Sequence, residues 1–392
     1  MKKNSNYLTL KESRRIIREN VRQMKYYEAQ KRINRAPEEY ICPMKDSGNV
    51  LEIEDLKTCF FTDTGTAMAV NGVSFSVPKG KIVGVVGESG CGKSVTSLSI
   101  MQLVQAPQGQ VVGGQIRYNS DELGEDEEGR KLAYDIVKMP TRAMYKVRGK
   151  DITMIFQEPM TSLNPVFTIG FQLDEVSFTH KPGISKEDAK KQSIEMLKKV
   201  GIAMPEHVYA SYPHELSGGM RQRVMIAMSL VCDSKLIIAD EPTTALDVTI
   251  QAQILDILRK LQKEQGCSIV LITHDLGVIA EMADYVVVMY AGKVIEKGDA
   301  KEIFHNPLHP YTIGLQKSKP LITSSSKEPL YSIPGQVPNP IDLPDHCYFY
   351  NRCERCTERC KGKYPEEVKV SDTHTVSCYL YEEQGKDAGE NA

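Results

Sequence analysis

Residues 87–94, Gly-Glu-Ser-Gly-Cys-Gly-Lys-Ser, have the residue types and spacing of a loop that binds phosphate groups. Glycines permit backbone angles closed to other residues, so successive N–H groups can turn towards one anion. Lys93 would reach the β- and γ-phosphates of a nucleotide, and the Ser94 hydroxyl would ligate Mg²⁺. The pattern predicts a site for a nucleoside triphosphate and its magnesium ion.

The residues on either side of this loop place it between a strand and a helix. Residues 81–86 are a short valine-rich run, as in a strand buried on both faces, and residues 95–104 have the composition of a helix. The loop therefore opens a helix, whose partial positive charge at the N-terminus favours anions. A chance lysine in a glycine-rich turn would not need both flanking elements.

Three further strand-like apolar runs end in polar side chains. The runs and their terminal residues are 152–156 with Gln157, 235–239 with Asp240 and Glu241, and 268–273 with His274. Because the carboxyl ends of strands in an open α/β sheet border one ligand crevice, these side chains should face the phosphate loop. Asp240 suits a water-mediated contact to Mg²⁺, and Glu241 suits a base that polarises the attacking water. Each residue alone is also compatible with a solvated loop, but the four strand ends together predict one site.

Residues 216–223 predict a second anion site. Ser217 is a natural N-cap for the helix that follows, and Gly218 and Gly219 leave bare N–H groups at its positive end. Phe60 lies between two runs of alternating polarity, residues 51–56 and 70–77. Its ring can stack on an adenine base or fill the core, and the spacing leaves both interpretations open.

Composition indicates an ordinary globular protein of two or three domains. The 392 residues are 41% hydrophobic and 26% charged, with a net charge of −2 that gives no global field for nucleic acid or membrane. No apolar run reaches the ~18 residues of a membrane-spanning helix. The N-terminus lacks the apolar segment of a secretory signal. We therefore expect a cytoplasmic location and no nucleic-acid partner.

Two segments carry concentrated charge. Residues 1–48 contain 12 Lys and Arg against 6 Asp and Glu, with apolar residues at helical spacing. They predict either a basic amphipathic helix that rests on an anionic membrane or a partner, or a solvated surface helix or frayed tail. Six of the eight residues 121–128 are acidic, so residues 119–150 are predicted to be a solvated surface insertion.

With these motifs in place, residues 50–315 resemble the nucleotide-binding subunit of an ATP-binding-cassette (ABC) transporter. In that family's terms the motifs are the Walker A loop (87–94), the Q-loop glutamine (Gln157), the signature (216–220), the Walker B aspartate (Asp240), the catalytic glutamate (Glu241), the D-loop (Ala245, Leu246 and Asp247) and the switch histidine (His274). The signature ends in Met220 where glutamine is usual, but its phosphate contacts come from Ser217 and backbone N–H groups.

The resemblance implies an α/β fold of the P-loop NTPase type. A mostly parallel sheet would form the core, with an antiparallel β subdomain and an α-helical subdomain. The implied divisions are a basic extension at 1–48, a nucleotide-binding domain at 49–315 with its helical subdomain at about 162–233, and a small cysteine-rich domain at 316–392.

The resemblance also implies an ATPase that converts ATP and water to ADP and phosphate. Catalysis is expected from Glu241, His274 and Gln157, and Mg²⁺ binding from Ser94, Gln157 and Asp240. The residues expected at the nucleotide are Phe60, Gly87, Glu88, Ser89, Gly90, Cys91, Gly92, Lys93, Ser94, Val95, Ser217, Gly218, Gly219, Asp240 and Asp247.

A finer resemblance is to importers of oligopeptides and dipeptides. It is carried by residues 158–165, 307–312 (Pro-Leu-His-Pro-Tyr-Thr), 333–335 (Ile-Pro-Gly) and the cysteine-rich tail. It implies a peripheral protein on the cytoplasmic face of the cell membrane. Its partners would be a second ABC ATPase subunit bound head to tail, two integral membrane permease subunits and, through the complex, an extracytoplasmic substrate-binding protein. The alternatives are the same role for another solute such as nickel chelates, or a soluble non-transport ABC ATPase.

Five of the ten cysteines lie between Cys347 and Cys378. The compartment disfavours disulfides. Cys347, Cys353, Cys360 and Cys378 supply four thiolates, enough for a [4Fe–4S] cluster or a tetrahedral zinc ion. Their C-x5-C-x6-C-x17-C spacing resembles that of importer subunits taken to bind a cluster, which favours the cluster over zinc or empty thiols. His346 and His374 are possible ligands but are expected on the surface.

Cys91 lies in the phosphate loop at the start of a helix. That position predicts a thiol of lowered pKa that alkylating reagents modify, with a buried and inert thiol as the alternative.

Overall fold

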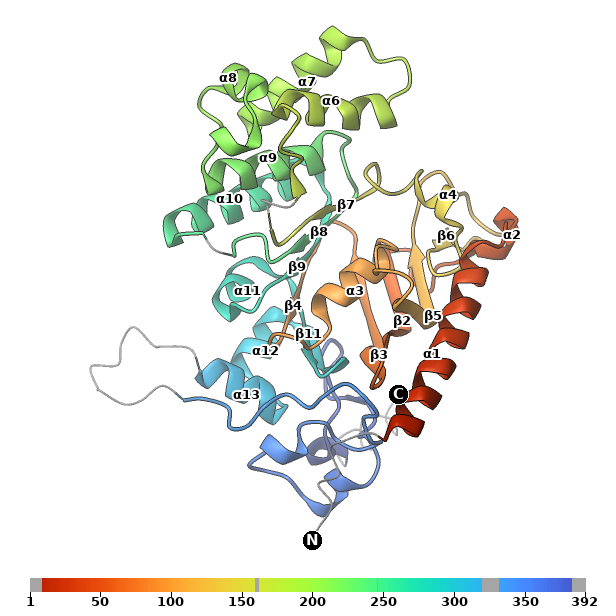
Figure 1. The fold of residues 1–392 in the computed structure, drawn as a ribbon. Coiled ribbons are helices and arrows are strands. Elements are labelled where there is room, and N and C mark those ends of the chain that lie inside the picture. The colour runs from red at the N-terminus through yellow and green to blue at the C-terminus, as the bar shows by residue number, and fades with distance from the viewer. Residues whose placement is uncertain (1–8, 159–161, 245, 319–330, 383–392) are drawn as a thin grey trace, which may run out of the picture.

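The computed structural model describes residues 9–158, 162–244, 246–318 and 331–382. Ala245 of the predicted D-loop and residues 159–161 of the segment after Gln157 lie outside the described residues. Two sheets and the helices around them make up the described part of the chain (Figure 1).

The strands form an antiparallel sheet and a mostly parallel central sheet. The antiparallel sheet has the order β1-β6-β5-β2-β3, with β1 (Ile41–Pro43), β2 (Asn49–Thr62), β3 (Gly65–Pro78), β5 (Gly109–Tyr118) and β6 (Leu132–Asp135). The central sheet has the order β12-β13-β11-β10-β4-β9-β8-β7, with β4 (Ile82–Val86), β7 (Ile152–Ile155), β8 (Leu236–Asp240), β9 (Ser268–Ile272), β10 (Tyr285–Tyr290), β11 (Lys293–Asp299), β12 (Val368–Lys369) and β13 (Thr375–Val376). All neighbouring pairs from β10 to β7 are parallel, which confirms the predicted core.

The helices pack around these two sheets. The α-helices are α1 (Leu10–Lys31), α2 (Pro37–Tyr40), α3 (Lys93–Ile100), α4 (Thr141–Met144), α6 (Ile169–His180), α7 (Lys186–Lys199), α8 (Pro205–Ala210), α9 (Gly218–Leu230), α10 (Val248–Gln265), α11 (Leu276–Met282), α12 (Ala300–His305) and α13 (Pro310–Lys317). Short 3-10 helices are η1 (Pro213–Glu215), η2 (Tyr350–Arg352), η3 (Glu358–Lys361) and η4 (Tyr379–Tyr381). Helices α6 to α9 gather at one end of the molecule, where a helical subdomain is predicted (Figure 1).

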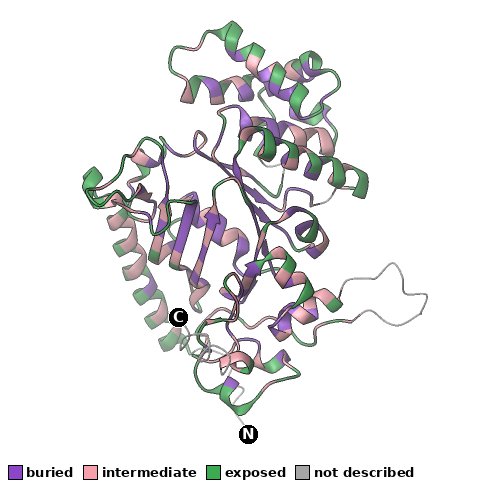
Figure 2. Ribbon diagram, turned by 180° about the vertical axis from the view of Figure 1, so that it is seen from behind, coloured by how far each residue is buried: buried purple, intermediate pink, exposed green. Residues whose placement is uncertain are grey.

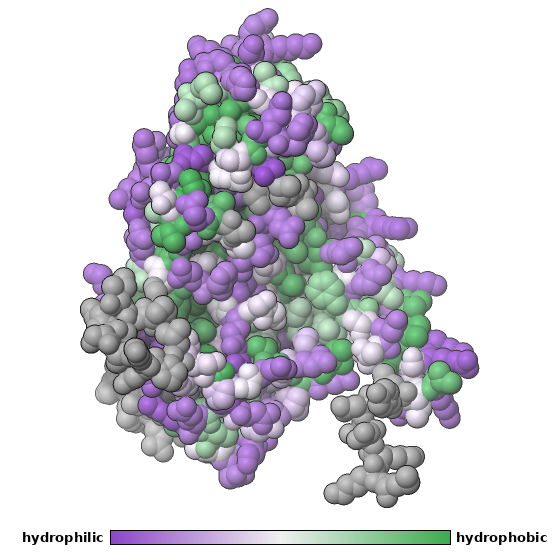
Figure 3. All heavy atoms as spheres, turned by 60° about the vertical axis from the view of Figure 1, so that its left-hand side comes forward, coloured by the Kyte–Doolittle hydropathy of each residue, from purple (hydrophilic) through white to green (hydrophobic). Residues whose placement is uncertain are grey.

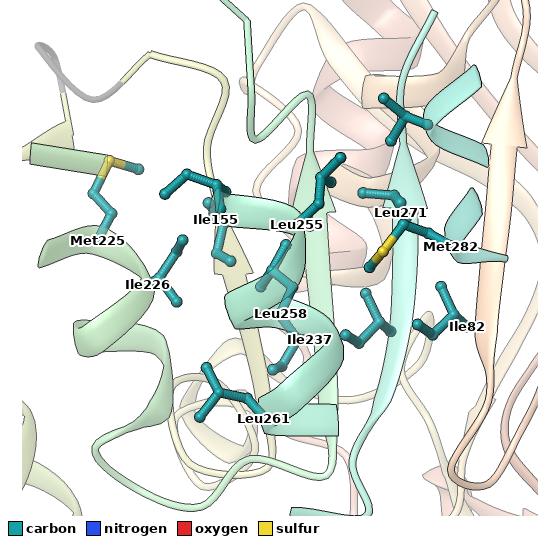
Figure 4. Packing of buried hydrophobic residues seen from close by; sticks show 14 of the residues in the cluster. Ile82, Ile155, Met225, Ile226, Ile237, Leu255, Leu258, Leu261, Leu271 and Met282 are labelled. Carbon is teal, nitrogen blue, oxygen red and sulfur yellow. The ribbon is translucent and has the colours of Figure 1, made fainter. Parts of the chain in front are cut away.

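The central strands are buried on both faces, as their apolar runs predict. In β4, Ile82 and Val86 belong to one core, whereas Val83 and Val85 belong to the core shared with the antiparallel sheet. Figure 4 shows the first core, in which side chains from α9 and α10 pack over the strands. Seen from behind, the strands are mostly purple, because few of their residues reach the surface (Figure 2). Rigid strands therefore hold the ends that carry the predicted site.

The basic N-terminal extension contains a docked helix. Helix α1 begins with a capping box between Thr9 and Glu12, and its buried Asn20 donates to the carbonyl of Thr62 at 2.8 Å. Tyr27 stacks on Phe61 of β2 with ring centroids 6.3 Å apart. The exposed side of α1 carries Lys11, Arg14, Arg15, Arg18 and Arg22. The described part of the extension is therefore a surface helix fixed to the antiparallel sheet, and not a frayed tail.

The prediction for residues 119–150 is wrong in its second half. The acidic residues 121–128 are mostly exposed, but β6 pairs with both β1 and β5. Ile136 and Met144 are fully buried. The apolar residues of this segment are spaced too irregularly to form one helical or strand period, and they find their partners only in the tertiary structure.

The cysteine-rich tail is joined to the cassette rather than separate from it. Strand β13 pairs with β11 and extends the central sheet. His374 is buried, and its Nε2 lies 2.8 Å from Oε1 of Glu296 in β11. The expectation that His374 lies on the surface is therefore wrong. Glu296 also accepts the backbone N–H groups of Leu308 and His309, so one carboxylate links the tail to the start of α13.

Within the part of the chain that the structure describes, no helix has the length and apolarity needed to cross a membrane. On the face shown in Figure 3, hydrophilic side chains cover most of the outer surface, with smaller hydrophobic patches between them.

Candidate nucleotide site

The phosphate loop connects β4 to α3, and glycine is required at two of its positions by close backbone contacts. A Cβ atom at Gly87 would lie 2.2 Å from the carbonyl oxygen of Met289, and one at Gly92 would lie 2.3 Å from that of Ala69. Gly92 has a φ of +99° and is the N-cap of α3. Only glycine lets the loop settle this closely onto β3 and β10. A Cβ atom at Gly90 would meet nothing within 4 Å, so the loop is open to a ligand there.

The lysine of the loop is buried and is held by the loop itself. The Nζ of Lys93 donates to the carbonyl oxygens of Gly87 at 2.8 Å and Glu88 at 3.1 Å. An ammonium group at the N-terminus of α3 can exchange these neutral acceptors for charged phosphate oxygens, which form stronger hydrogen bonds. Ser89 is exposed, and Val95 packs against the core as part of α3.

Ser94 and Asp240, two of the residues predicted to bind magnesium, contact each other. The Ser94 hydroxyl donates to Oδ1 of Asp240 at 3.0 Å, and Ser97 donates to Oδ2 at 3.4 Å. Burial raises the pKa of Asp240, and the hydrogen bond from Ser94 partly opposes that rise. A divalent cation next to the carboxylate would favour its ionised form. A hydroxyl and a carboxylate at a strand end are the hard oxygen donors that Mg²⁺ takes, so these residues fit the ion.

Three side chains converge on one oxygen of Glu241. Its Oε2 lies 3.1 Å from Nε2 of Gln157, 2.8 Å from Oγ1 of Thr244 and 3.4 Å from Nδ1 of His274. The predicted catalytic residues Gln157 and His274, from the ends of β7 and β9, thus both contact Glu241 at the end of β8. The arrangement fixes a carboxylate that can orient and polarise a water molecule.

Two further features of this group escaped the sequence analysis. Thr244 carries no signal in the sequence, because a threonine three residues after an acid is common in loops. Glu241 has a φ of +47°, a conformation that non-glycine residues adopt rarely and that tends to mark functional sites.

Phe60 is half-buried in β2 and faces away from α1, since its neighbours Cys59 and Phe61 lie on the other side of the strand. It pairs with Ala67 of β3, two residues from the Ala69 carbonyl that contacts the phosphate loop. This position is compatible with stacking on a base whose phosphates lie in the loop.

The signature lies away from the phosphate loop of its own chain. Ser217 caps α9 by accepting the N–H of Met220, and Asp247 caps α10 by accepting that of Ile250. Helix α9 packs against α6, α7 and β7, whereas α3 packs against β2, β3 and β8. A Cβ atom at Gly219 would lie 3.0 Å from the Ile250 side chain, so the starts of α9 and α10 adjoin each other. The N–H groups of Gly218 and Gly219 are therefore not part of the anion site that the phosphate loop of the same chain forms.

The prediction that Cys91 has a lowered thiol pKa is wrong. Its side chain is fully buried in the core beneath the loop, and burial raises its pKa more than the nearby Lys93 lowers it. The position of Cys91 at the start of a helix indicates only that the partial positive charge of the helix N-terminus acts on its thiol. Whether the thiol points to solvent or into the core depends on the packing of β4 and β10. Only the backbone of Cys91 can serve the phosphate.

We accordingly expect Cys91 to resist alkylation in the folded protein. Iodoacetamide labelling followed by peptide mapping should modify the partly exposed Cys356 long before Cys91. Guanidinium chloride should remove the difference between the two thiols. Rapid labelling of Cys91 in the folded state would contradict the buried position.

The four predicted cluster cysteines surround one cavity of about 160 Å³. Cys347, Cys353, Cys360 and Cys378 line it, together with His309 and Phe349, whereas Cys356 does not. Burial raises the pKa of Cys347 to about 12 and that of Cys378 to about 11. Among the described residues, no group of three or more His, Cys, Asp or Glu side chains is placed to hold a metal ion.

Comparison with solved structures places the fold among ABC transporter cassettes. A bacterial ABC transporter cassette solved as a dimer is 25% identical, with a TM-score of 0.53, and the match covers 64% of this chain and 98% of that one. The cbiO1 protein of Clostridium perfringens, part of the ABC transporter complex cbiONQ, is 26% identical with a TM-score of 0.52, over 66% of this chain and 92% of that one. The ABC transporter family matches residues 70–244.

Sequence comparison narrows the class. The oligopeptide transport ATP-binding protein AppD of Bacillus subtilis is 48% identical over 336 residues, which are 86% of this chain and 98% of AppD. The dipeptide transport ATP-binding protein DppD of Escherichia coli is 44% identical over 84% of this chain and 96% of DppD. Residues 295–360 match the C-terminal region of oligopeptide/dipeptide transporters. The chain belongs to the ABC transporter family, among its oligopeptide and dipeptide transport ATP-binding proteins.

Proposed function

We propose that this chain is the ATPase subunit of an ABC importer that takes up oligopeptides or dipeptides. The observation that carries the proposal is the convergence of Gln157, Thr244 and His274 on Glu241, next to a phosphate loop joined to Asp240 through Ser94. Each residue that ATP hydrolysis requires is present, so the chain is built as a working ATPase. Its relatives AppD of Bacillus subtilis and DppD of Escherichia coli are named for oligopeptide and dipeptide transport.

The geometry supports a head-to-tail pair of cassettes. The loop at α3 and the signature at α9 pack against different elements, which favours a signature supplied to this nucleotide by a second cassette. Two helix N-termini from different subunits would stabilise one triphosphate from opposite sides. The second cassette is either another copy of this chain or a homologous ATPase.

The chain's own residues would do the following work during hydrolysis. Bound Mg²⁺ would neutralise charge on the phosphates, and Ser94, Gln157 and Asp240 would hold it. Lys93 would hold the β- and γ-phosphates, and Phe60 would stack on the base. Glu241 would orient and polarise the attacking water, with His274 and Thr244 fixing its carboxylate.

Exposed aromatic side chains on α6 and just before it support contact with membrane subunits. Phe167, which precedes α6, and Phe171 stack with ring centroids 4.6 Å apart, and both are exposed, as is Phe178 further along α6. Clustered exposed phenylalanines are typical of protein interfaces. We propose that this face of α6 binds the permease subunits and holds the protein at the cytoplasmic face of the membrane. An extracytoplasmic substrate-binding protein would deliver the cargo.

Purification of the complex from native membranes tests this function. The tagged chain should co-purify with integral membrane proteins, and mass spectrometry of the substrate-binding protein that belongs to the complex should find bound peptides. A nickel chelate in that protein would assign the transporter to another solute. Co-sedimentation with ribosomes in place of membranes would favour a soluble ABC ATPase and overturn the importer.

We also propose that the cysteine-lined cavity holds a [4Fe–4S] cluster. In its support, the four thiols that the spacing singles out line one cavity and Cys356 does not. A zinc ion needs four ligands about 2.3 Å from one point. A cubane of four irons is larger than a single ion and is held by four cysteine thiolates. Since thiolates are the ligands, the raised thiol pKa values would fall when the metal binds.

Anaerobic purification tests the cluster. We expect brown protein with about four irons per chain, because four thiolates hold one cubane. Cys360→Ser should bleach the colour, and Cys356→Ser is the matched control that should leave it. Colourless protein with one zinc ion per chain would overturn the cluster.

A further inference from the structure

One residue of the phosphate loop is held by a side chain from the far end of the chain. Arg352 forms a bidentate ion pair with Glu88, Nη1 to Oε2 at 2.6 Å and Nη2 to Oε1 at 2.9 Å. The Arg352 side chain is only 5% exposed and that of Glu88 is 29% exposed. Two parallel charge-assisted hydrogen bonds fix the direction of the carboxylate as well as its position.

A second side chain holds the backbone of the same residue. The N–H of Glu88 donates to the hydroxyl of Tyr311 in α13 at 2.7 Å, and Tyr311 is fully buried. The carbonyl of Glu88 accepts from Lys93. The N–H and the side chain of Glu88 therefore each have a partner that ATP would not displace, and the loop can turn its remaining N–H groups towards a ligand.

A rigid aromatic group supports both contacts. The rings of Tyr290, Tyr311 and Phe349 lie 4.7 to 5.4 Å apart, and the Arg352 guanidinium lies 5.7 Å from the Tyr290 ring centroid and 5.8 Å from that of Phe349. Nε of Arg352 donates to the carbonyl of Pro334 at 2.7 Å. The guanidinium is thus oriented before it meets Glu88.

Both contacts originate at the wall of the cysteine-lined cavity. Arg352 ends η2, between the cavity residues Cys347 and Cys353, and Phe349 itself lines the cavity. Tyr311 follows His309 and Pro310, which also line it. A shift of the cavity wall would therefore move Arg352 and Tyr311, and with them Glu88.

We propose that Arg352 and Tyr311 are positioning residues for the phosphate loop. Through them, ATP affinity would depend on where the residues that line the cysteine-lined cavity lie. The inference rests on the proposed function, because it takes the loop as the ATP site. The two residues touch the loop and not the nucleotide, so they act on where the loop N–H groups lie. Loss of either contact should weaken ATP binding more than it slows turnover at saturating ATP.

Steady-state kinetics with a double-mutant cycle test the positioning role. Arg352→Gln, Tyr311→Phe and Glu88→Gln should each raise the KM for ATP about tenfold, within the usual range of coupling between sites, with a smaller change in kcat. Arg352→Gln and Glu88→Gln combined should be no worse than the single variants, because they remove the same contact. Arg352→Lys should restore part of the affinity.

The matched control is Arg259→Gln, which breaks an Arg–Glu ion pair between α10 and α11, far from the loop in sequence. Its KM should equal that of the parent protein. Thermal unfolding identifies a variant that misfolds. If Arg352→Gln misfolds, Glu88→Gln still tests the positioning role, because Glu88 is the more exposed partner of the pair. An unchanged KM in folded Arg352→Gln or Glu88→Gln, or additive effects in the double variant, would overturn the positioning role.

Equilibrium binding of a fluorescent ATP analogue tests separately whether the cysteine-lined cavity affects ATP affinity. Cys353→Ser should weaken binding in the parent protein but have no further effect in the Arg352→Gln background. Additive effects in that pair would overturn the link. Lys93→Ala separates this inference from the proposed function. If Lys93→Ala still binds ATP, the proposed nucleotide site is wrong. If Lys93→Ala loses ATP binding but the Arg352 variants bind ATP as the parent protein does, the inference alone fails.

Discussion

In a Glu241→Gln variant, ATP binding should persist while hydrolysis falls by about 10²- to 10⁴-fold, the usual contribution of a general base. The carboxamide keeps the size of the side chain and can still accept the hydrogen bond from Thr244. It lacks the charge that polarises a water molecule. Equilibrium binding of a fluorescent ATP analogue and phosphate release under multiple turnover measure the two properties separately.

One comparison for this variant is a carboxylate away from the site, and the other is a residue that contacts Glu241. Asp256→Asn on the exposed face of α10 removes a carboxylate elsewhere and should leave hydrolysis unchanged. His274→Ala should lower hydrolysis less than Glu241→Gln, because it removes a partner of the carboxylate and not the carboxylate itself. Near-normal turnover in Glu241→Gln would mean that another group activates the water.

The strand ends of the central sheet were predictable because their pattern is local. A run of four or five apolar residues followed at once by a polar residue identifies a buried strand and its carboxyl end. Parallel topology then brings Gln157, Asp240, Glu241 and His274 to one edge without any knowledge of the loops between them. The glycines at 87 and 92 were predictable as a motif, although the contacts that exclude a side chain come from Met289 and Ala69.

The features that sequence reasoning missed depend on pairs of residues far apart in the chain. Glu88 and Arg352 are separated by 264 positions, and neither has a local pattern that points to the other. His374 looked like a surface residue because polar residues surround it in the tail, yet its partner Glu296 lies 78 positions away. Burial of a charged group is decided by its tertiary partner, and a single sequence does not name that partner.

Lys93 and Cys91 have different environments, although they stand two residues apart in one loop. At the start of α3, the loop turns one side chain towards the site of the phosphates and the other into the core. Lys93 Nζ rests on the carbonyls of Gly87 and Glu88, where a triphosphate can replace them. The Cys91 side chain is fully buried in the core shared by the two sheets.

For Lys93→Ala we expect ATP affinity to fall by about 100-fold, because hydrogen bonds between charged groups contribute about 1.5–3 kcal/mol each and no other side chain of the loop carries positive charge. Hydrolysis at moderate ATP concentrations should fall at least as much. The nucleotide-free protein should stay folded, because the Nζ of Lys93 contacts atoms of its own loop, namely the carbonyls of Gly87 and Glu88 and the sulfur of Cys91, and thermal unfolding checks this. Titration with a fluorescent ATP analogue measures the affinity.

The matched control for Lys93→Ala is Lys81→Ala at the entrance to β4. Lys81 is an exposed lysine paired with Asp284 at 3.2 Å, and its loss should leave ATP affinity unchanged because an exposed pair contributes little. Lys93→Arg should not restore binding, since the buried position beneath the loop fits an ammonium group and the wider guanidinium would displace the carbonyls of Gly87 and Glu88. Retained ATP binding in folded Lys93→Ala would mean that ATP binds elsewhere and that the predicted site is wrong.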